Sequence, residues 1–276
     1  MSGGYMKFSN VQLQRLVELG LEEGLERDFD CGRQRDDSFR QLARGLEKNN
    51  KAALDRLQQG LRPDIKLLEE KLLHTLRAEG YAEVSTPILM SKGLLQKMGL
   101  TPEHPLWRQL FWVDKNKLLR PMLAPHLYHL LRHLQKLWDG SVMIFEVGPV
   151  FRKESKGQEH VEEFTMLNLV SLGCTNPDEQ LRLMVDKLFG QFGKTYSLVC
   201  APSEVYGETT DVVIRGLEVA SAAVGPHALD ANWEISGPWF GMGIGLERLA
   251  MAVGDYSNIR RVSRSLSYQN GARLNI

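Results

Sequence analysis

The sequence predicts an α+β protein, with a helical appendage over residues 1–60 and a larger domain over 61–276 in which helices flank an antiparallel sheet. Strand-like apolar runs gather in two stretches, 142–172 and 196–249, instead of alternating regularly with helices. Helical patterns with apolar residues three and four apart precede and separate these stretches. This order argues against an alternating parallel fold.

The appendage is predicted from two amphipathic segments. Apolar residues recur at helical spacing from Phe8 to Leu21 and again from Phe39 to Leu61. The charged segment 28–37 between them has little apolar content, so it predicts a connection. Pro63 then breaks the helical pattern. We therefore expect two or three helices ahead of the domain.

Three further helices are predicted within the domain, at Leu67–Leu76, Leu127–Leu137 and Leu181–Phe192. His126, His129 and His133 share one side of the second helix, a spacing that raises the question of a zinc site. No acidic or cysteine partner stands at ligand spacing, and a leucine stripe occupies the same helix. The pattern favours ordinary packing over a metal centre.

Charge is balanced overall and concentrated locally. Lys and Arg number 34 and so do Asp and Glu, which excludes a bulk attraction to nucleic acid. Arg132 and Lys136 stand four apart on one helix face. Beyond Ser257 the chain is basic without a single acidic residue, through Arg260, Arg261, Arg264 and Arg273. Each concentration is either a solvated surface or a site of phosphate contacts.

The cysteines and the hydropathy pattern predict a reduced, cytoplasmic protein. Cys31, Cys174 and Cys200 are odd in number and far apart, without metal-type or redox-type spacing. No apolar run reaches about 18 residues, and the amino end has no signal-peptide pattern. We expect a soluble intracellular chain.

The most informative motif is the run GMGIGLER at residues 241–248. Glycine at every second position strips one face of a strand of its side chains, so that a flat ligand can lie against the backbone. A helix is predicted to begin at Leu246, with Arg248 projecting back over the same space. There it can stack on an aromatic base and pair with phosphate. The alternative is an ordinary glycine-rich strand–helix junction.

A second motif predicts a hairpin. An apolar run over 142–150 leads into Arg152 and Glu154, a polar turn follows, and an apolar strand resumes over 164–172. Residues two apart on a strand point to one face, so Arg152 and Glu154 would face the same ligand space, with His160 near the loop. The alternative is a cross-strand ion pair on a solvated hairpin.

Together these motifs resemble the second and third signatures of the class II aminoacyl-tRNA synthetases. The first signature of that family is built around a proline, and the segment GYAEVSTPIL at 80–89 fits it through Pro87. All three appear in the expected order. More specific segments are similar to the pyrrolysyl-tRNA synthetases of the bacterial type, whose catalytic chain lacks a separate amino-terminal tRNA-binding domain. These segments are LRPMLAPHLY (119–128), FRKES (151–155), FTMLN (164–168), VYGET (205–209) and RSLSY (264–268).

The resemblance implies ligation of pyrrolysine to its amber-suppressor tRNA, tRNA(Pyl), through an aminoacyl-adenylate, with ATP and Mg²⁺. Because neither step needs a protein nucleophile, catalysis rests on positioning and on charge stabilisation. The implied catalytic residues are Arg152 on the α-phosphate and Arg248. The implied ATP-binding residues are Arg152, Glu154 on the adenine amino group, His160 on the outer phosphates, Phe164 and Arg248 on either side of adenine, Gly243, and Glu218 and Ser221, which hold Mg²⁺ with ATP oxygens.

The residues that match the family's amino-acid pocket are Ala124, Leu127, Tyr128, Leu131, Asn168, Val170, Tyr206 and Trp239. All but Asn168 are apolar or aromatic, and a site for a bare lysine ammonium would need a carboxylate. The set therefore fits a long side chain with a bulky uncharged end, and the Asn168 amide can bond a substrate amide carbonyl. Tyr206, on a predicted hairpin over 203–210, would act as a lid. Two residues depart from the family: His126 stands where asparagine is usual, and Val170 stands where a smaller or polarisable residue is common.

The resemblance also implies tRNA contacts and a homodimer. Phosphate contacts are expected from Arg132 and Lys136 and, in the appendage, from Arg15, Arg33, Arg35, Arg40 and Arg44, although nearby acids nearly cancel the latter set. Whether a separate N-terminal tRNA-binding protein assists is left open. The other functions considered are a class II synthetase for phenylalanine or phosphoserine and a synthetase-like regulatory protein without ligase activity. The uncharged pocket argues against phosphoserine, and retention of the ATP-contacting arginines argues against the regulator.

Overall fold

The computed structural model describes residues 5–153, 157 and 159–275, which divide into two compact units. The first unit combines residues up to 67 with those from 256 onward, and the second spans Leu68–Asp255. The carboxyl-terminal residues thus belong with the amino-terminal helices, whereas the sequence-based division put them in the larger domain. Glu154 lies outside the described residues.

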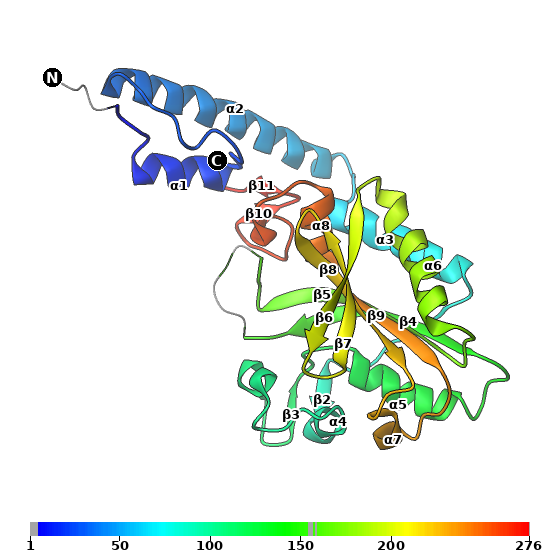
Figure 1. Cartoon of the computed structure of the whole chain (residues 1–276). Coiled ribbons are helices and arrows are strands. Elements are labelled where there is room, and N and C mark those ends of the chain that lie inside the picture. The colour runs from blue at the N-terminus through cyan, green and yellow to red at the C-terminus, as the bar shows by residue number, and fades with distance from the viewer. Residues whose placement is uncertain (1–4, 154–156, 158, 276) are drawn as a thin grey trace. The chain divides into compact units, whose positions relative to one another are not determined.

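A seven-stranded sheet in the order β1-β4-β5-β9-β8-β7-β6 forms the second unit (Figure 1). Its strands are β1 (Ala82–Glu83), β4 (Val142–Phe151), β5 (Glu163–Leu172), β6 (Tyr196–Ser203), β7 (Gly207–Ile214), β8 (Leu217–Gly225) and β9 (Trp239–Gly245). All neighbours are antiparallel except the β1–β4 pair at the edge. A small hairpin of β2 (Leu89–Ser91) and β3 (Lys117–Leu119) is separate. The predicted antiparallel sheet is confirmed, with one parallel strand added at its edge.

Register across the centre of the sheet aligns the site residues. Three rungs cross β5, β9 and β8, namely Asn168–Gly243–Ser221, Val170–Gly241–Ala223 and Leu172–Trp239–Gly225. Because side chains alternate along a strand, these residues share one face of the sheet. The alternating glycines of β9 therefore leave the middle of that face without side chains.

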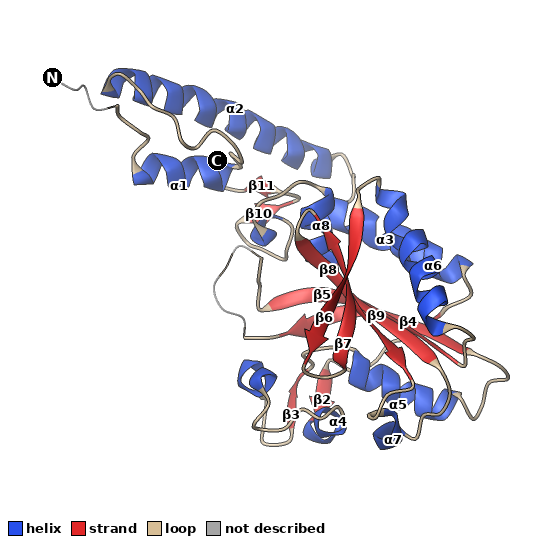
Figure 2. Ribbon diagram, viewed as in Figure 1, coloured by secondary structure: helices blue, strands red, loops and turns tan. Residues whose placement is uncertain are grey.

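The helices of the second unit cover the sheet on both faces (Figure 2). They are α3 (Asp64–Ala78), which begins just before the unit, α4 (Lys92–Lys97), α5 (Ala124–Leu134), α6 (Pro177–Phe189), α7 (Asp230–Trp233) and α8 (Leu246–Val253), with the 3₁₀ turns η1 (Pro105–Gln109) and η2 (Gly190–Phe192). α5 packs on β4 and β5, while α6 and α8 pack on the central strands. Pro125 and Pro177 stand in the first turns of α5 and α6, where a missing N–H costs nothing.

The first unit is built on α1 (Asn10–Leu19) and α2 (Gly32–Gln58). Phe8, Leu16, Leu19 and Ala43 form its buried core. Contrary to expectation, α2 begins well before Phe39, and the predicted connection over 28–37 is wrong for its second half. Residues 32–37 include no apolar side chain and none of them is buried, so the periodicity gave no signal there.

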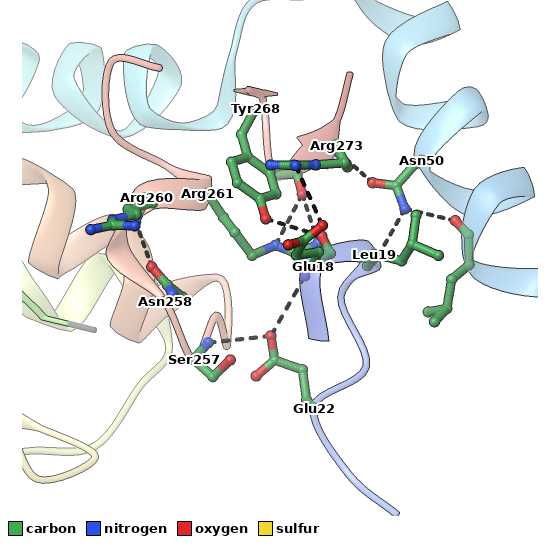
Figure 3. Close-up of polar contacts among 12 residues, drawn as sticks. Glu18, Leu19, Glu22, Asn50, Ser257, Asn258, Arg260, Arg261, Tyr268 and Arg273 are labelled. Carbon is green, nitrogen blue, oxygen red and sulfur yellow. Dashed lines mark hydrogen bonds and ion pairs between the residues drawn. The ribbon is translucent and has the colours of Figure 1, made fainter. Parts of the chain in front are cut away.

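The carboxyl-terminal segment of the first unit carries η3 (Ile259–Arg261), β10 (Tyr268–Gln269) and β11 (Ala272–Arg273). The Asn50 side chain donates to the carbonyls of Leu19 and Leu46 at 2.8 and 2.7 Å and accepts from the Arg273 N–H at 2.6 Å (Figure 3). Arg261 donates to the Gly271 carbonyl. Ion pairs join Arg261 to Glu22 and Arg273 to Glu18, so two of the four tail arginines serve packing within the unit.

Cysteine and hydropathy features are simple in the described part of the chain. Cys31 and Cys200 are exposed, Cys174 is buried, and all three are free thiols. Among the described helices, none combines the length and the hydropathy needed to traverse a lipid bilayer.

Candidate active site

The glycine-rich strand runs directly into the helix that carries Arg248. β9 ends at Gly245, and α8 begins at Leu246 as predicted. Glu247 is 1% exposed, and its two carboxylate oxygens accept the Thr165 N–H of β5 at 2.9 and 2.8 Å. This charge-assisted contact ties α8 to β5. The acidic member of the motif therefore anchors the helix and leaves its neighbour Arg248 to face outward.

Arg248 contacts two of the residues expected to bind ATP. Its Nη2 lies 3.0 Å from His160 Nε2, and its Nη1 lies 3.3 Å from Glu218 Oε2. A guanidinium has only donors, so Nε2 of His160 is the acceptor in this contact. Arg248 is a quarter exposed, which keeps this cluster open to a ligand.

Arg152 and Phe164 form a second pair of expected ATP-binding residues. Arg152 follows β4, and Phe164 stands on β5 opposite Val150. The guanidinium carbon of Arg152 lies 5.5 Å from the centre of the Phe164 ring, and its Nε donates to the Pro121 carbonyl at 2.8 Å. The β4–β5 register confirms the predicted hairpin, but β4 ends at Phe151, so Arg152 follows the strand instead of lying on it as predicted.

An irregularity in β8 explains how Glu218 and Ser221 can act together. Residues three apart on a regular strand point to opposite faces. Here Glu218 pairs with Val213 and Ala220 with Val212, so the β8 strand carries one extra residue at this point. Such a bulge shifts the alternation by one position. Glu218 and Ser221 can then face the same side despite their spacing.

The residues expected to form the amino-acid pocket meet in one apolar cluster. Leu127, Tyr128 and Leu131 of α5, Val170 of β5 and Trp239 of β9 are buried together, and the half-buried Ala124 and Tyr206 pack against them. The Tyr128 and Tyr206 rings lie 5.8 and 6.1 Å from the Trp239 ring. Burial raises the pKa of Tyr206 to about 12 and that of Tyr128 further still, so both phenols stay neutral. Tyr206 stands in the predicted hairpin, between β6 and β7.

Asn168 is the polar member of this region, and its place depends on a glycine. A Cβ at Gly243 would lie 3.0 Å from Asn168 Oδ1, tighter than nearly all such contacts. The bare Gly243 backbone thus makes room for the amide. Asn168 and Ser221 flank Gly243 on the same rung, which brings the presumed amino-acid and nucleotide residues side by side.

Sequence reasoning missed a buried polar network next to the pocket helix. Arg120 and Glu146 pair at 2.7 Å with side chains 2% and 3% exposed. Thr86 donates its hydroxyl to Glu146 at 2.7 Å and lies 3.1 Å from His126 Nδ1. A Cβ at Gly148 would meet the Arg120 guanidinium at 2.0 Å. Burial lowers the pKa of His126. The signal for this network was an arginine within an apolar segment before Pro121.

The cations and histidines that the sequence singled out on α5 have partners within the protein. Arg132 and Lys136 both pair with Glu234, at 2.5 and 3.6 Å. His129 and His133 stack edge to face, 5.0 Å apart, while His126 turns to Thr86. In the described part of the chain, no group of three or more His, Cys, Asp or Glu is arranged to hold a metal ion.

Comparison with known proteins gives one family match and close structural neighbours. Residues 48–270 match the family model described as tRNA synthetases class II core domain (F). The crystal structure of pyrrolysyl-tRNA synthetase from Desulfitobacterium hafniense is 43% identical, with complete coverage of both chains and a TM-score of 0.92. A second structure, of PylSc, a pyrrolysyl tRNA synthetase of the same organism, is 44% identical, covers 98% of this chain and 96% of its own, and has a TM-score of 0.89.

Proposed function

This chain belongs to the class II aminoacyl-tRNA synthetase family, and on that premise we propose that it ligates pyrrolysine to its cognate amber-suppressor tRNA. The amino-acid carboxylate attacks the α-phosphorus of ATP and releases pyrophosphate. The terminal hydroxyl of the tRNA then takes the acyl group from the adenylate. The single observation that carries the proposal is full-length similarity to pyrrolysyl-tRNA synthetase, and the apolar cluster around Trp239 agrees with it.

The nucleotide end supports adenylate formation by charge stabilisation. Arg152 would bridge the α-phosphate and the attacking carboxylate, because a guanidinium fork matches two oxygens at once. Arg248 and Phe164 would enclose adenine, and His160 would reach the outer phosphates. The contacts between Arg248 and His160 and between Arg152 and Phe164 support this arrangement. Glu154 is assigned to the adenine amino group by resemblance alone.

Glu218 and Ser221 fit Mg²⁺ as ligands. Both offer hard oxygen atoms, a half-exposed carboxylate and a partly buried hydroxyl, which is the donor type that Mg²⁺ prefers. When bound with ATP, Mg²⁺ would neutralise charge on phosphate oxygens. Glu218 also orients Arg248 through its carboxylate and its backbone carbonyl.

The amino-acid end supports a long uncharged side chain. The cluster of Leu127, Tyr128, Val170 and Trp239 presents apolar surface, and Asn168 offers an amide next to it. Pyrrolysine carries a neutral amide on a long stem with a ring at its end. The Asn168 side chain would bond the amide carbonyl, and Tyr206 would close over the ring. His126 does not contribute its Nδ1, which is held by Thr86.

A basic stripe on α2 supports tRNA binding by the appendage. Arg33, Arg40, Arg44, Lys48 and Lys51 recur at helical spacing and are all exposed. Arg40 pairs with Asp37 and Lys51 with Asp55. Arg33 and Arg44 form no ion pair within the described residues, so their charges are available to phosphates. Arg132 and Lys136 would have to exchange Glu234 for phosphate, which makes them weaker contributors.

A homodimer is part of the same proposal. Ile88 and Leu89, next to Pro87, are 43% and 48% exposed. Exposed apolar side chains of this kind favour a protein partner, and the first signature of the family provides one in a second copy. Light scattering after size exclusion would give the mass of one chain if this part of the proposal is wrong.

The decisive assay is aminoacylation of the amber-suppressor tRNA, read on an acid gel, after pyrophosphate exchange with a panel of amino acids. Exchange with pyrrolysine and charging of that tRNA are expected. Exchange with phenylalanine instead would reassign the substrate, and exchange with no amino acid would favour a regulatory protein. Charging without an added amino-terminal tRNA-binding protein would show that such a partner is dispensable.

A further inference from the structure

Trp239, at the start of β9, is hydrogen-bonded to a buried aspartate of the same unit. Its indole Nε1 donates to Asp230 Oδ2 at 2.8 Å. Trp239 is 3% exposed and Asp230 is 6% exposed. We propose that Asp230 is a positioning residue that sets the indole of Trp239 and thereby the selectivity of the amino-acid pocket. This inference rests on the proposed function of that pocket.

The contact is a hydrogen bond to one oxygen and not an ion pair. The same Oδ2 accepts the His227 N–H at 2.7 Å, while Oδ1 has no hydrogen-bond partner among the described residues. Within that part of the chain no Lys, Arg or His pairs with Asp230. Two neutral donors therefore converge on a single acceptor oxygen, a role that an uncharged amide oxygen at the same place can also fill.

A glycine on the next strand completes the support of the indole. Gly225 of β8 is the register partner of Trp239, and a Cβ built on it would lie 2.0 Å from Trp239 Nε1. Any larger residue would push the ring away from Asp230. The indole is therefore fixed between the backbone of Gly225 and the Asp230 carboxylate oxygen that accepts its N–H.

The segment that leads into Asp230, the first residue of α7, also supports the lid. His227, three residues earlier, places its ring 5.7 Å from that of Tyr206. Its Nδ1 accepts the Leu229 N–H at 3.1 Å, which orients the imidazole. Tyr206 in turn lies 6.1 Å from Trp239. The short segment from Gly225 at the end of β8 to Asp230 at the start of α7 therefore sets two aromatic rings of the pocket, and a shift of Asp230 alters the space left for the end of the substrate.

Two substitutions separate geometry from charge. Asp230→Ala leaves the buried indole N–H unpaired, and the KM for pyrrolysine in pyrophosphate exchange should rise about tenfold, while the KM for ATP stays within about twofold. Asp230→Asn keeps an oxygen where Oδ2 stands and places its amide nitrogen where the unpaired Oδ1 was. We expect it to restore a near-normal KM for pyrrolysine.

A mutant cycle tests whether Asp230 acts through Trp239. Trp239→Phe removes the N–H donor, so adding Asp230→Ala to it should change the KM for pyrrolysine by less than about twofold. Trp138→Phe is the matched control, because Trp138 is 40% exposed and lies beyond the end of α5, so the loss of its N–H should leave the KM unchanged. Circular dichroism melting would identify any variant that fails to fold. If Asp230→Ala does not fold, the KM of Asp230→Asn is the test.

The outcomes distinguish this inference from the proposed function. If the unaltered protein does not activate pyrrolysine, the proposed function fails first. If it does, the inference is overturned by an Asp230→Ala variant with normal KM, by equal increases in the KM for ATP and pyrrolysine, or by additive effects of Asp230→Ala and Trp239→Phe. It is also overturned if Asp230→Asn behaves like Asp230→Ala.

Discussion

Strand β9 joins two regions that hold their side chains in opposite ways. Near its carboxyl end Arg248 contacts His160 and Glu218, all at least partly exposed. At its amino end Trp239 is almost fully buried, and its indole N–H donates to the buried carboxylate of Asp230. The contrast fits the different roles proposed for the two regions. Charges open to water can rearrange around a nucleotide, whereas a packed aromatic ring can discriminate between side chains only if it does not move.

The largest effect is expected on the free energy of unfolding, from Arg120→Met in the buried network next to the pocket helix. Removing one partner of the Arg120–Glu146 pair leaves a buried carboxylate and should cost about 3–5 kcal/mol. Tryptophan fluorescence during unfolding measures this directly, since all five tryptophans lie within residues 68–255. The double variant Arg120→Met/Glu146→Met should lose less. If the two variants melt alike, the pair is not the source of the stability.

The next largest effect is expected at the charged end. Arg248→Ala should lower pyrophosphate exchange about a hundredfold or more, because it removes the guanidinium that would stack on adenine and that contacts His160, and it should leave the melting temperature close to normal. Arg215→Ala is a matched control, since Arg215 pairs with Asp255 at an exposed turn. Retained activity in Arg248→Ala would remove this residue from the site.

A smaller effect is expected on α2. Changing Arg33 and Arg44 together to Ala should raise the KM for tRNA roughly tenfold and lower the salt dependence of tRNA binding by about two phosphate contacts. Pyrophosphate exchange, which needs no tRNA, should be unchanged. A loss of exchange in this variant would mean that the stripe serves folding instead of tRNA.

The smallest effect concerns pH. Burial, with help from Arg120 and His129, lowers the pKa of His126, while Glu146 opposes the shift. The unfolded chain takes up a proton near pH 6.5 and the folded chain only at lower pH, so stability should fall as pH drops below about 6.5. His126→Asn should flatten the fall in melting temperature between pH 7.5 and 5.5. An unchanged slope would assign it to other groups.

Much of the fold was predictable because periodicity survives wherever one face of an element is buried. The helices at α1, α3, α5 and α6 and the β4–β5 hairpin follow from apolar spacing. The start of α2 was not predictable, since residues 32–37 include no apolar side chain. Neither was the membership of the carboxyl-terminal segment in the first unit, because it depends on contacts such as Asn50 with Arg273 that have no local signal.

More of the nucleotide end of the candidate site could be predicted from the sequence than of the amino-acid end. Arg152 and Arg248 stand in motifs whose spacing indicates a ligand. Asp230 gave no such signal, because a lone aspartate after Pro226 and His227 resembles an ordinary turn residue. Its partner is nine positions away, and only the β8–β9 register shows that Gly225 faces the same indole. Supporting residues of this kind emerge from tertiary packing.

The most direct test is a crystal structure of the protein with a non-hydrolysable ATP analogue and Mg²⁺. We expect one nucleotide on the glycine-bearing face of β9, with Arg152 at its α-phosphate and with adenine between Phe164 and Arg248. A nucleotide bound elsewhere, or one that touches only one of the two arginines, would contradict it.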